Sequence, residues 1–484
     1  MGRRFFLLLV ALVIIKAVFL LADPTPSFYF GDSGAYLTTA VGKWIPPNHS
    51  FVYGLLLRPL AVWPRSLEPV VVFQAGLSAI ASWAVALCLV RYLGVRFPVG
   101  AAASLLCAVE PLQLMSERYI LPETVGTFLF TMVMLSAFNY LKTGSLSLLV
   151  FIQILSVVLV SIEIGYLPIV LANAILLPLL SRRGVRFWKS TSRRARTGWG
   201  RVNWPNGLRF VVLPLVVSVV FSQALLIAYR SLHGSLLERP PAYVYQDGFS
   251  MAGVLAPLIK PVDFPVPGKR ADVFSALRYP LSDPRNRSAQ RWMQGGLCQA
   301  IQQSTGNNEL EANRLAKETA IHAARRDPGG VLRLAAFTFG EYFQWSVLEN
   351  SLKVDEGQYV HSLPREAQML KTVFGIDVEQ RTFDSLTKRW QRASVPWCWL
   401  ILLMPFAFLI WVAFHWNRAT SSWALCLWVS FILLAEAIIA VDNPTSHNLN
   451  ALAWLTFLTG GIVLDGILVR TRKRRYQVLK ADKV

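Results

Sequence analysis

The sequence predicts an all-α polytopic membrane protein with a mainly helical extracytoplasmic domain. Three observations support this fold class. The 484 residues are 54% hydrophobic and only 16% charged, whereas a soluble chain carries about 25% charged residues. Apolar stretches close to the roughly 20 residues that cross a bilayer recur along the chain. Basic residues gather in the segments on one side of these stretches.

We expect about ten transmembrane helices. The first begins almost at the N-terminus, and Lys16 interrupts its apolar run. The fifth and sixth are short and share a tight turn. The expected spans are 5–21, 69–90, 98–115, 122–141, 148–162, 166–180, 210–229, 396–416, 423–441 and 450–469.

The formal net charge of +20 indicates membrane topology rather than nucleic-acid binding. With the N-terminus in the cytoplasm, the inside segments hold 22 Lys and Arg residues, many of them in the 181–209 loop and the C-terminal tail. This bias orients membrane proteins. Both termini are therefore expected in the cytoplasm, and the protein is expected in the plasma (bacterial inner) membrane. The basic segments are expected to contact membrane lipids and not nucleic acid. The short outside segments hold only Lys43, Arg58, Arg65 and Arg118.

The predicted topology divides the chain into three parts. Residues 1–230 form an N-terminal transmembrane module with a first outer loop at 22–68. Residues 231–395 form an extracytoplasmic domain, called here the outer domain, and 396–484 form the last spans and a basic tail. Within the outer domain, a helix is expected near 308–326, begun by an Asn cap and stopped at Asp327-Pro328.

The most informative polar motif is GDSGAY at residues 31–36, directly after the first span on the outer face. A carboxylate at the water–lipid boundary is costly unless it is hydrated, paired or used. We therefore interpret Asp32 as a candidate catalytic base. A helix cap or an ion pair with Lys43 is the alternative role.

Chemistry on the outer face of a membrane has no access to cytosolic nucleotide sugars or ATP. An activated group must therefore arrive on a lipid of the outer leaflet. Transfer of a sugar from a lipid phosphate to a hydroxyl needs a base for the acceptor and cations for the departing phosphate. Candidate phosphate partners near the outer interface are Lys43, Arg58, Arg118, His447 and Lys16.

The pattern DSxxY at residues 32–36 resembles the first-loop acidic motif of GT-C superfamily glycosyltransferases. The sequence SERYILPET at 116–124 is similar to the second outer loop of bacterial members, where an acidic residue opens the fourth span. The RDP stop at 326–328, followed by an amphipathic helix, is similar to their outer domain. The nearest branch is that of the protein O-mannosyltransferases and lipid A aminoarabinose transferases.

This resemblance implies an inverting transferase that uses a polyprenyl-phosphate sugar donor, a glycan, lipid or protein acceptor, and no metal or other cofactor. The first-loop acid of the family, here Asp32, activates or positions the acceptor. The second-loop acid corresponds to Glu123, with Glu117 as its competitor. Together with the interface residues above, the candidate substrate-binding residues are Tyr36, Lys43, Arg58, Glu117, Arg118 and His447.

The chain departs from the bacterial pattern at two places. Where relatives often carry an Arg-Pro pair before the sixth span, this chain reads IEIG at 162–165. Where they often carry an Arg-Tyr pair before the last span, it reads NPTSHN at 443–448. We therefore expect His447 to take the phosphate-binding role of the arginine that the relatives carry there.

Two other classes of function stay open. A transporter or flippase of lipid-linked saccharide would place charges at mid-membrane, whereas this sequence concentrates its acids at one face. A cell-envelope assembly protein would leave Asp32 and Glu123 without a shared cavity. Glu163 lies in a hydrated turn, Glu436 is expected to pair or to line a lipid pocket, and Lys16 is expected to snorkel to the headgroups.

Overall fold

The computed structural model describes residues 2–29, 32–42, 44–181, 204–355, 364–377, 389–390, 392, 395–418 and 420–481. Within these residues the chain is helical and no strand forms, apart from one isolated bridge between Ser27 and Tyr119. The predicted all-helical class is therefore confirmed for the described chain. Lys43, most of the basic 181–209 loop and the last three residues lie outside this description.

Seven helices of the described chain are long and apolar enough to cross a membrane, which indicates a multi-pass membrane protein. Each corresponds to an expected span. They are α1 (Gly2–Ala22), α4 with its continuation η2 (Glu68–Leu87 and Cys88–Tyr92), α7 (Glu123–Thr143), α11 (Trp204–Leu237), α21 (Val395–Phe414), α22 (Ser421–Ile439) and α23 (Asn450–Ala481).

The other three expected spans are shorter apolar helices, namely α5 (Phe97–Ala108), α8 (Leu146–Ile162) and α9 (Leu167–Leu180). The expected span at 98–115 differs most, because it breaks at Glu110. This carboxylate accepts hydrogen bonds from the backbone N–H groups of Leu112 and Gln113, at 3.1 and 2.6 Å. It thereby caps a new helix, α6 (Pro111–Ser116), whose first residue is a proline that has no N–H to satisfy.

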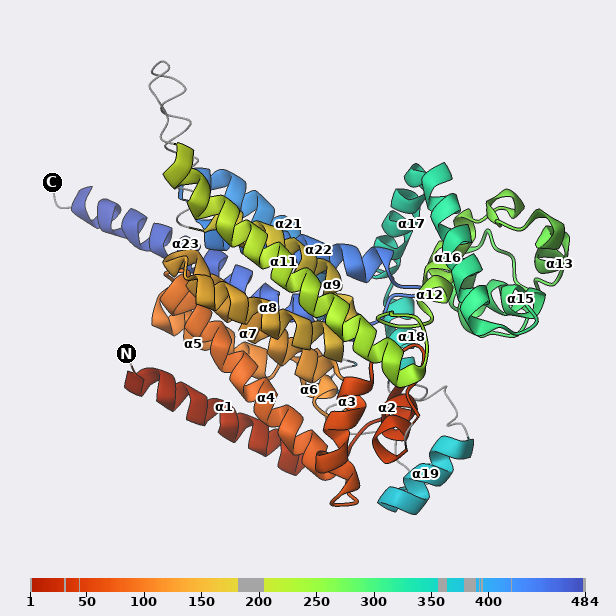
Figure 1. The fold of residues 1–484 in the computed structure, drawn as a ribbon. Coiled ribbons are helices and arrows are strands. Elements are labelled where there is room, and N and C mark those ends of the chain that lie inside the picture. Colours follow the sequence, from red (N-terminus) through yellow and green to blue (C-terminus); the bar gives the residue numbers. More distant parts are fainter. Residues whose placement is uncertain are drawn as a thin grey trace.

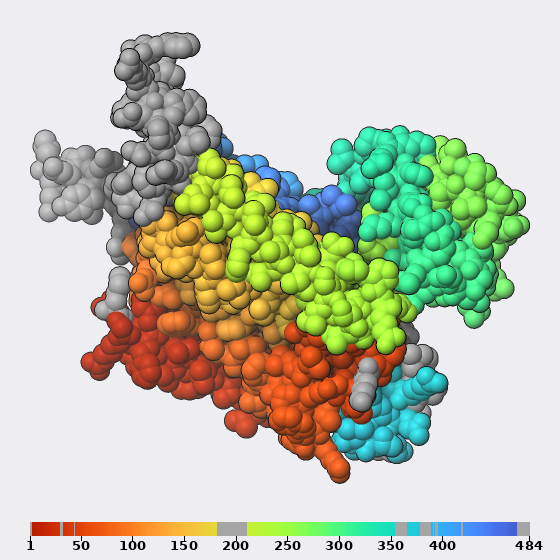
Figure 2. All heavy atoms as spheres, in the orientation of Figure 1, coloured from red at the N-terminus to blue at the C-terminus, as the bar shows by residue number. Residues whose placement is uncertain are grey.

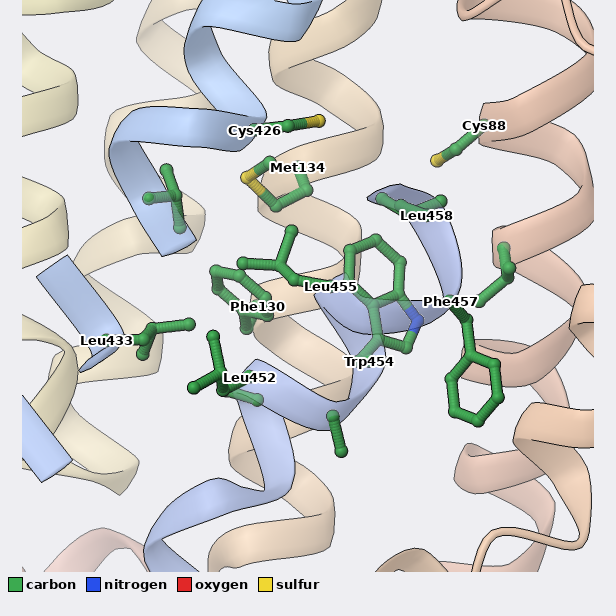
Figure 3. Packing of buried hydrophobic residues seen from close by; sticks show 14 of the residues in the cluster. Cys88, Phe130, Met134, Cys426, Leu433, Leu452, Trp454, Leu455, Phe457 and Leu458 are labelled. Atoms are coloured by element: carbon green, nitrogen blue, oxygen red, sulfur yellow. The ribbon is translucent and has the colours of Figure 1, made fainter. Parts of the chain in front are cut away.

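The centre of the bundle is built around α23. This helix packs against α4, α5, α7, α21 and α22. Its Trp454 is buried, and the indole Nε1 donates a hydrogen bond to the carbonyl of Ala81 at 3.0 Å. Figure 3 shows the indole between the rings of Phe130 and Phe457. A buried indole needs such a partner for its N–H, so this bond fixes the register of α23 against α4.

Helices α1 and α11 lie at the periphery of the bundle (Figure 1). In each of these two helices, only 22% of the most apolar 18-residue stretch is buried, against 67% in α7. A continuous exposed apolar surface of this kind marks a membrane-contacting face. The exposed apolar side chains include Phe6, Leu7 and Ile14 on α1 and Val216, Val220 and Ile227 on α11.

The outer domain projects from one end of the bundle and has a core of its own (Figures 1 and 2). As predicted, a helix (α16) follows the Asn308 cap and stops before Asp327, whose carboxylate accepts a hydrogen bond from Gly330 N at 2.7 Å and caps α17. Helix α11 continues to Leu237, so the first residues assigned to this domain belong to the bundle. The helices of the projecting part are α12 (Asp247–Leu255), α13 (Arg270–Ser275), α14 (Arg287–Trp292), α15 (Leu297–Ser304), α16 (Glu309–Arg326) and α17 (Pro328–Glu341). The last two helices of the range assigned to this domain, α18 (Trp345–Asp355) and α19 (Pro364–Phe374), pack on apolar clusters of the bundle instead.

A buried ion pair ties α1 to the rest of the bundle. Lys16 does not snorkel, so that prediction was wrong: its ammonium group is buried, pairs with the carboxylate of Glu117 and donates to the carbonyl of Ala108 at 2.6 Å. Ser78 Oγ donates to the same carboxylate at 2.6 Å. Glu117 is fully buried, so its charge depends on these partners.

Arg118 completes this network. Its buried guanidinium donates to the backbone carbonyls of Phe19, Asp23 and Leu114, at 2.9, 3.1 and 2.7 Å, and lies 3.8 Å from Glu117 Oε2. These bonds hold the outer end of α1 against the turn that follows α6. Glu117 and Arg118 are thus engaged by the protein itself, and we do not propose them as substrate ligands.

Replacing Lys16 by Met should destabilise the protein by about 3 kcal/mol, because it leaves a buried carboxylate without its main partner. The double variant K16M/E117Q should recover most of that loss. Lys142→Met, which removes an exposed ammonium group, is the control and should change stability by less than about 0.5 kcal/mol. Unfolding in detergent measures all three variants. A K16M protein as stable as the wild type would contradict the role assigned to this pair.

Candidate active site

Asp32 opens helix α2 (Asp32–Val41), which packs against α3 (Phe51–Leu57) at the outer-domain end of the bundle. A carboxylate at a helix N-terminus is stabilised by the helix dipole. The side chain of Asp32 is 41% exposed, and its Oδ1 lies 3.0 Å from Nε2 of His49. Asp32 is therefore open to solvent on one side and held by the protein on the other.

His49 links Asp32 to Tyr36. The Tyr36 hydroxyl lies 3.3 Å from His49 Nδ1, and the two rings are 4.9 Å apart. Burial, followed by the charges of Asp32, Glu123 and Glu163, raises the pKa of the Tyr36 phenol well above its ordinary value. The imidazole of His49 lies between the Tyr36 hydroxyl and the Asp32 carboxylate. The Asn48 side-chain amide also approaches Nε2, at 3.0 Å.

The environment of Asp32 favours its ionised form. Burial works to raise its pKa, but the hydrogen bond to His49 and the charges of His49, His447 and Arg291 outweigh burial. The pKa of Asp32 therefore lies below its ordinary value, and the group is a carboxylate at neutral pH.

Glu123 lies within electrostatic range of this group of residues. It is the first residue of α7 and interacts electrostatically with Asp32, His49 and His447. Its Oε2 is buried and has no hydrogen-bond partner among the described residues. The structure thus brings Asp32, Glu123, Tyr36 and His447 together, all of which were candidates from the sequence.

Two further carboxylates, those of Glu163 and Glu436, extend the acidic group of Asp32 and Glu123 into the bundle. Glu163 Oε2 would stand 2.4 Å from a Cβ atom placed on Gly126, and Glu436 Oε1 would stand 2.6 Å from one on Gly165. Any side chain at these two glycines would collide with a carboxylate, so the glycines make room for them. Glu163 interacts electrostatically with both Glu123 and Glu436.

The cations near Asp32 differ from those expected. Arg58 donates to the carbonyls of Thr39, Ala40 and Gly42, at 3.2, 3.1 and 2.8 Å, and so binds the C-terminal end of α2. Arg118 lies in the buried network described above, and Lys43 falls outside the described residues. None of these three is shown near the Asp32 carboxylate.

Arg291 is a residue that sequence reasoning missed. It belongs to α14 of the outer domain, yet it interacts electrostatically with Asp32 and Asp442. Its guanidinium lies over the ring of Trp292, 4.2 Å from the centroid, and its Nε is buried without a hydrogen-bond partner in the described chain. No local pattern marks Arg291, because its interactions with Asp442 and Asp32 depend on how the outer domain docks on the bundle. His49 was also missed, although a histidine in the first outer loop was a usable signal.

His447 lies in η9 (His447–Leu449), with its ring centroid 5.5 Å from that of Tyr29. Both side chains line a small cavity, the outer cavity. A second cavity, the inner cavity, lies within the bundle and shares Ser116 and Asn450 with the first. The outer cavity is lined by Tyr29, Leu112, Met115, Ser116, Tyr119, Leu121, Ser446, His447 and Asn450. The inner cavity is lined by Ser78, Ala81, Cys107, Glu110, Gln113, Ser116, Thr124, Thr127, Asn450, Ala453, Trp454 and Phe457.

The comparisons with known proteins do not assign this site. The sequence matches no family model, and it matches no curated protein. Among the described residues, no three His, Cys, Asp or Glu side chains lie close enough together to hold a metal ion.

The lowered pKa of Asp32 predicts a specific pH dependence of stability. Because the pKa is lower in the folded than in the unfolded chain, ionised Asp32 stabilises the fold above about pH 4, and this contribution disappears as the pH falls through the folded-state pKa. Asp32→Asn should therefore lower the melting temperature by about 1 °C at pH 6, and the difference from wild type should shrink toward pH 3.

His49→Ala should behave in the same way, since it removes the partner of Asp32. The double variant D32N/H49A should lose no more stability than the larger single loss, as expected for two groups in one interaction. Thermal unfolding between pH 3 and pH 7 measures this. A difference that stays constant over that range would contradict the assigned electrostatics.

Proposed function

We propose that this protein is a membrane glycosyltransferase of the GT-C type. It moves a sugar from a polyprenyl-phosphate donor to an acceptor hydroxyl on the outer face of the plasma (bacterial inner) membrane. The observation that carries the proposal is the setting of Asp32: a solvent-open, ionised carboxylate bound to His49, with Glu123, His447 and Arg291 within electrostatic range. The resemblance of the first outer loop to GT-C enzymes adds to it.

In this reaction the acceptor oxygen bonds to the anomeric carbon while the bond from that carbon to the phosphate oxygen breaks. The bonding electrons leave with the phosphate, and the acceptor proton passes to Asp32. A carboxylate with a lowered pKa is a weak base, so it takes the proton only as the oxygen–carbon bond forms. His49 holds the carboxylate in place during this step, and Glu123 orients the acceptor.

The leaving phosphate needs positive charge near Asp32. Arg291 and His447 are the described residues that supply it, because both interact electrostatically with Asp32. As candidate phosphate ligands they replace Arg58 and Arg118, whose guanidinium groups donate to backbone carbonyls. Arg291 comes from the outer domain and His447 from the loop before α23, so the phosphate site forms only when these two parts meet.

A transporter or flippase of lipid-linked saccharide is the second candidate. The observation that favours it is the row of Glu123, Glu163 and Glu436, which runs from the Asp32 site into the bundle. Charged groups within a bundle mark translocation pathways in transporters. In that case Glu436→Gln would abolish function while Asp32→Asn would not.

The central test is transfer of sugar by Asp32→Asn in membranes supplied with polyprenyl-phosphate sugar. Loss of the catalytic carboxylate should reduce transfer by at least about 100-fold. Asp247→Asn is a matched control, because Asp247 also lies in the first turn of a helix and is 39% exposed, but it pairs with Lys317 in the outer domain. Unchanged turnover of Asp32→Asn at normal expression would refute the proposal.

Arg291→Gln should raise the KM for the lipid-phosphate donor about tenfold, the effect of losing one charged hydrogen-bond partner. The KM for the acceptor should stay unchanged, because the proposed role concerns the phosphate. Arg314→Gln is the control: this arginine is 52% exposed and pairs with Glu311 and Glu318 on its own helix. An equal effect on donor and acceptor, or none on either, would remove Arg291 from the phosphate site.

A further inference from the structure

Helix α19 packs against the helices of the first outer loop. Its Leu370 and Phe374 are buried in one apolar cluster together with Tyr36 and Leu37 of α2. Figure 1 shows α19 beside α2 at the end of the bundle. The chain between the two transmembrane parts thus returns one of its helices to the helix that Asp32 opens.

The buried face of α19 contains an acidic residue. Buried residues recur at positions 366, 370 and 374, which lie on one face of a helix. The first of them is Glu366, which is only 9% exposed. Acidic side chains are almost never buried unless the protein uses them in a pairing. A leucine at this position would simply continue the apolar stripe, so packing alone does not explain Glu366.

The Glu366 side chain lies against the first turn of α2. A Cβ atom placed on Gly34 would overlap the carboxyl group of Glu366 and would stand 2.8 Å from its Cγ. Only glycine leaves this room, because every other residue carries a Cβ atom. The Cα–Cβ bonds of a helix tilt toward its N-terminus. The carboxyl group therefore occupies the side of Gly34 that faces the start of α2.

An acidic group at this place interacts favourably with α2. The first N–H groups of a helix have no intrahelical acceptor, and the helix dipole favours negative charge beside them. Asp32 is the first residue of the same helix. A side chain that orders this turn therefore also fixes the point from which Asp32 reaches His49. Because Glu366 is buried whereas the Asp32 side chain is 41% exposed, we assign Glu366 to the helix and Asp32 to the substrate.

We propose that Glu366 is a positioning residue for Asp32. From α19 it holds the first turn of α2, and through that turn it holds the carboxylate of Asp32 beside His49 in the geometry that transfer needs. This inference rests on the proposed function and adds the docking of α19 to the assembly of the active site. A misplacement of about 1 Å at a reacting group can lower a rate about 100-fold, so a residue that never touches substrate can govern kcat.

Glu366→Leu separates positioning from packing, because leucine continues the apolar stripe of α19. The melting temperature in detergent should equal or exceed that of the wild type, since an apolar residue in place of a buried polar one is often neutral or stabilising. The kcat of sugar transfer should nevertheless fall about 10- to 100-fold, with the KM for donor and acceptor changed less than about twofold. Glu366→Gln keeps an acceptor oxygen at the same place and should lose less than about threefold.

Gly34→Ala reaches the same contact from α2. Alanine by itself favours a helix, but its methyl group would displace the carboxyl group of Glu366. Its kcat should fall as that of E366L does, and the double variant G34A/E366L should lose no more than the larger single loss. Gln368→Leu is the matched control, because it adds the same side chain to the exposed face of α19. It should transfer sugar at the wild-type rate.

Amide hydrogen exchange of the full-length protein in nanodiscs tests the contact without any transfer step. In E366L, residues 32–41 should exchange about three- to tenfold faster than in the wild type, while residues 51–57 of α3 should not change. The inference is overturned if E366L transfers sugar at the wild-type rate, if it raises KM instead of lowering kcat, or if the exchange of α2 is unchanged. A loss in Glu366→Gln as large as in E366L would also overturn it, because it would assign Glu366 to proton transfer.

The exchange measurement also separates this inference from the proposed function. Faster exchange of α2 in E366L, together with undiminished transfer by Asp32→Asn, would refute the catalytic role of Asp32 and leave the ordering of α2 by Glu366 standing. Unchanged exchange in E366L, together with loss of transfer by Asp32→Asn, would support the catalytic role and refute the positioning role.

Discussion

The cost of placing a charge inside an apolar bundle governs this structure. Every buried ionised group must be neutralised by a partner, bound by hydrogen-bond donors or open to water. Glu117 meets this requirement through Lys16 and Ser78, and these contacts fix α1 against the bundle. Asp32 lies in the same outer region but meets the requirement differently, with partial exposure and a histidine. That difference separates a carboxylate used for structure from one left available for chemistry.

The same requirement separates two kinds of buried arginine, those whose guanidinium is bound by protein carbonyls and those whose guanidinium is not. A guanidinium that is fully occupied by backbone carbonyls, such as Arg118, holds loops together and is closed to ligands. Arg287 acts similarly between the outer domain and the bundle, since it donates to Thr338 Oγ1 and to the carbonyl of Val441, at 3.0 and 3.1 Å. One turn further along α14, Arg291 has no such carbonyl partners among the described residues, and it interacts electrostatically with Asp442 and Asp32.

The contact between the outer domain and the loop before α23 therefore matters for the site. Tyr342 strengthens it, because its hydroxyl lies 3.3 Å from the carbonyls of Ala437 and Thr445. This contact sets the position of the loop that carries His447 and Asn450. It links two features that the sequence separates widely, Arg291 of the outer domain and His447, both of which interact electrostatically with Asp32.

The sequence by itself determined the helical class, the apolar segments and the position of Asp32 directly after the first of them. These are local properties, since hydrophobic length and the residues near a span end are read within about 20 positions. It also predicted the cap at Asn308 and the stop at Asp327, because capping chemistry is local as well. It did not show the break at Glu110, which depends on a carboxylate that turns back to cap its own chain.

Only the tertiary structure decided which charges are free to act. Lys16 and Glu117 are far apart in sequence, as are Arg291 and Asp32. Composition cannot reveal that the first two form a buried ion pair while the second two interact electrostatically. The inner cavity likewise depends on α4, α5, α6, α7 and α23 meeting at one level. Hydrophobic patterning requires these helices to pack together, but the side chains at their contacts choose the register, and the register determines which polar atoms remain without a partner.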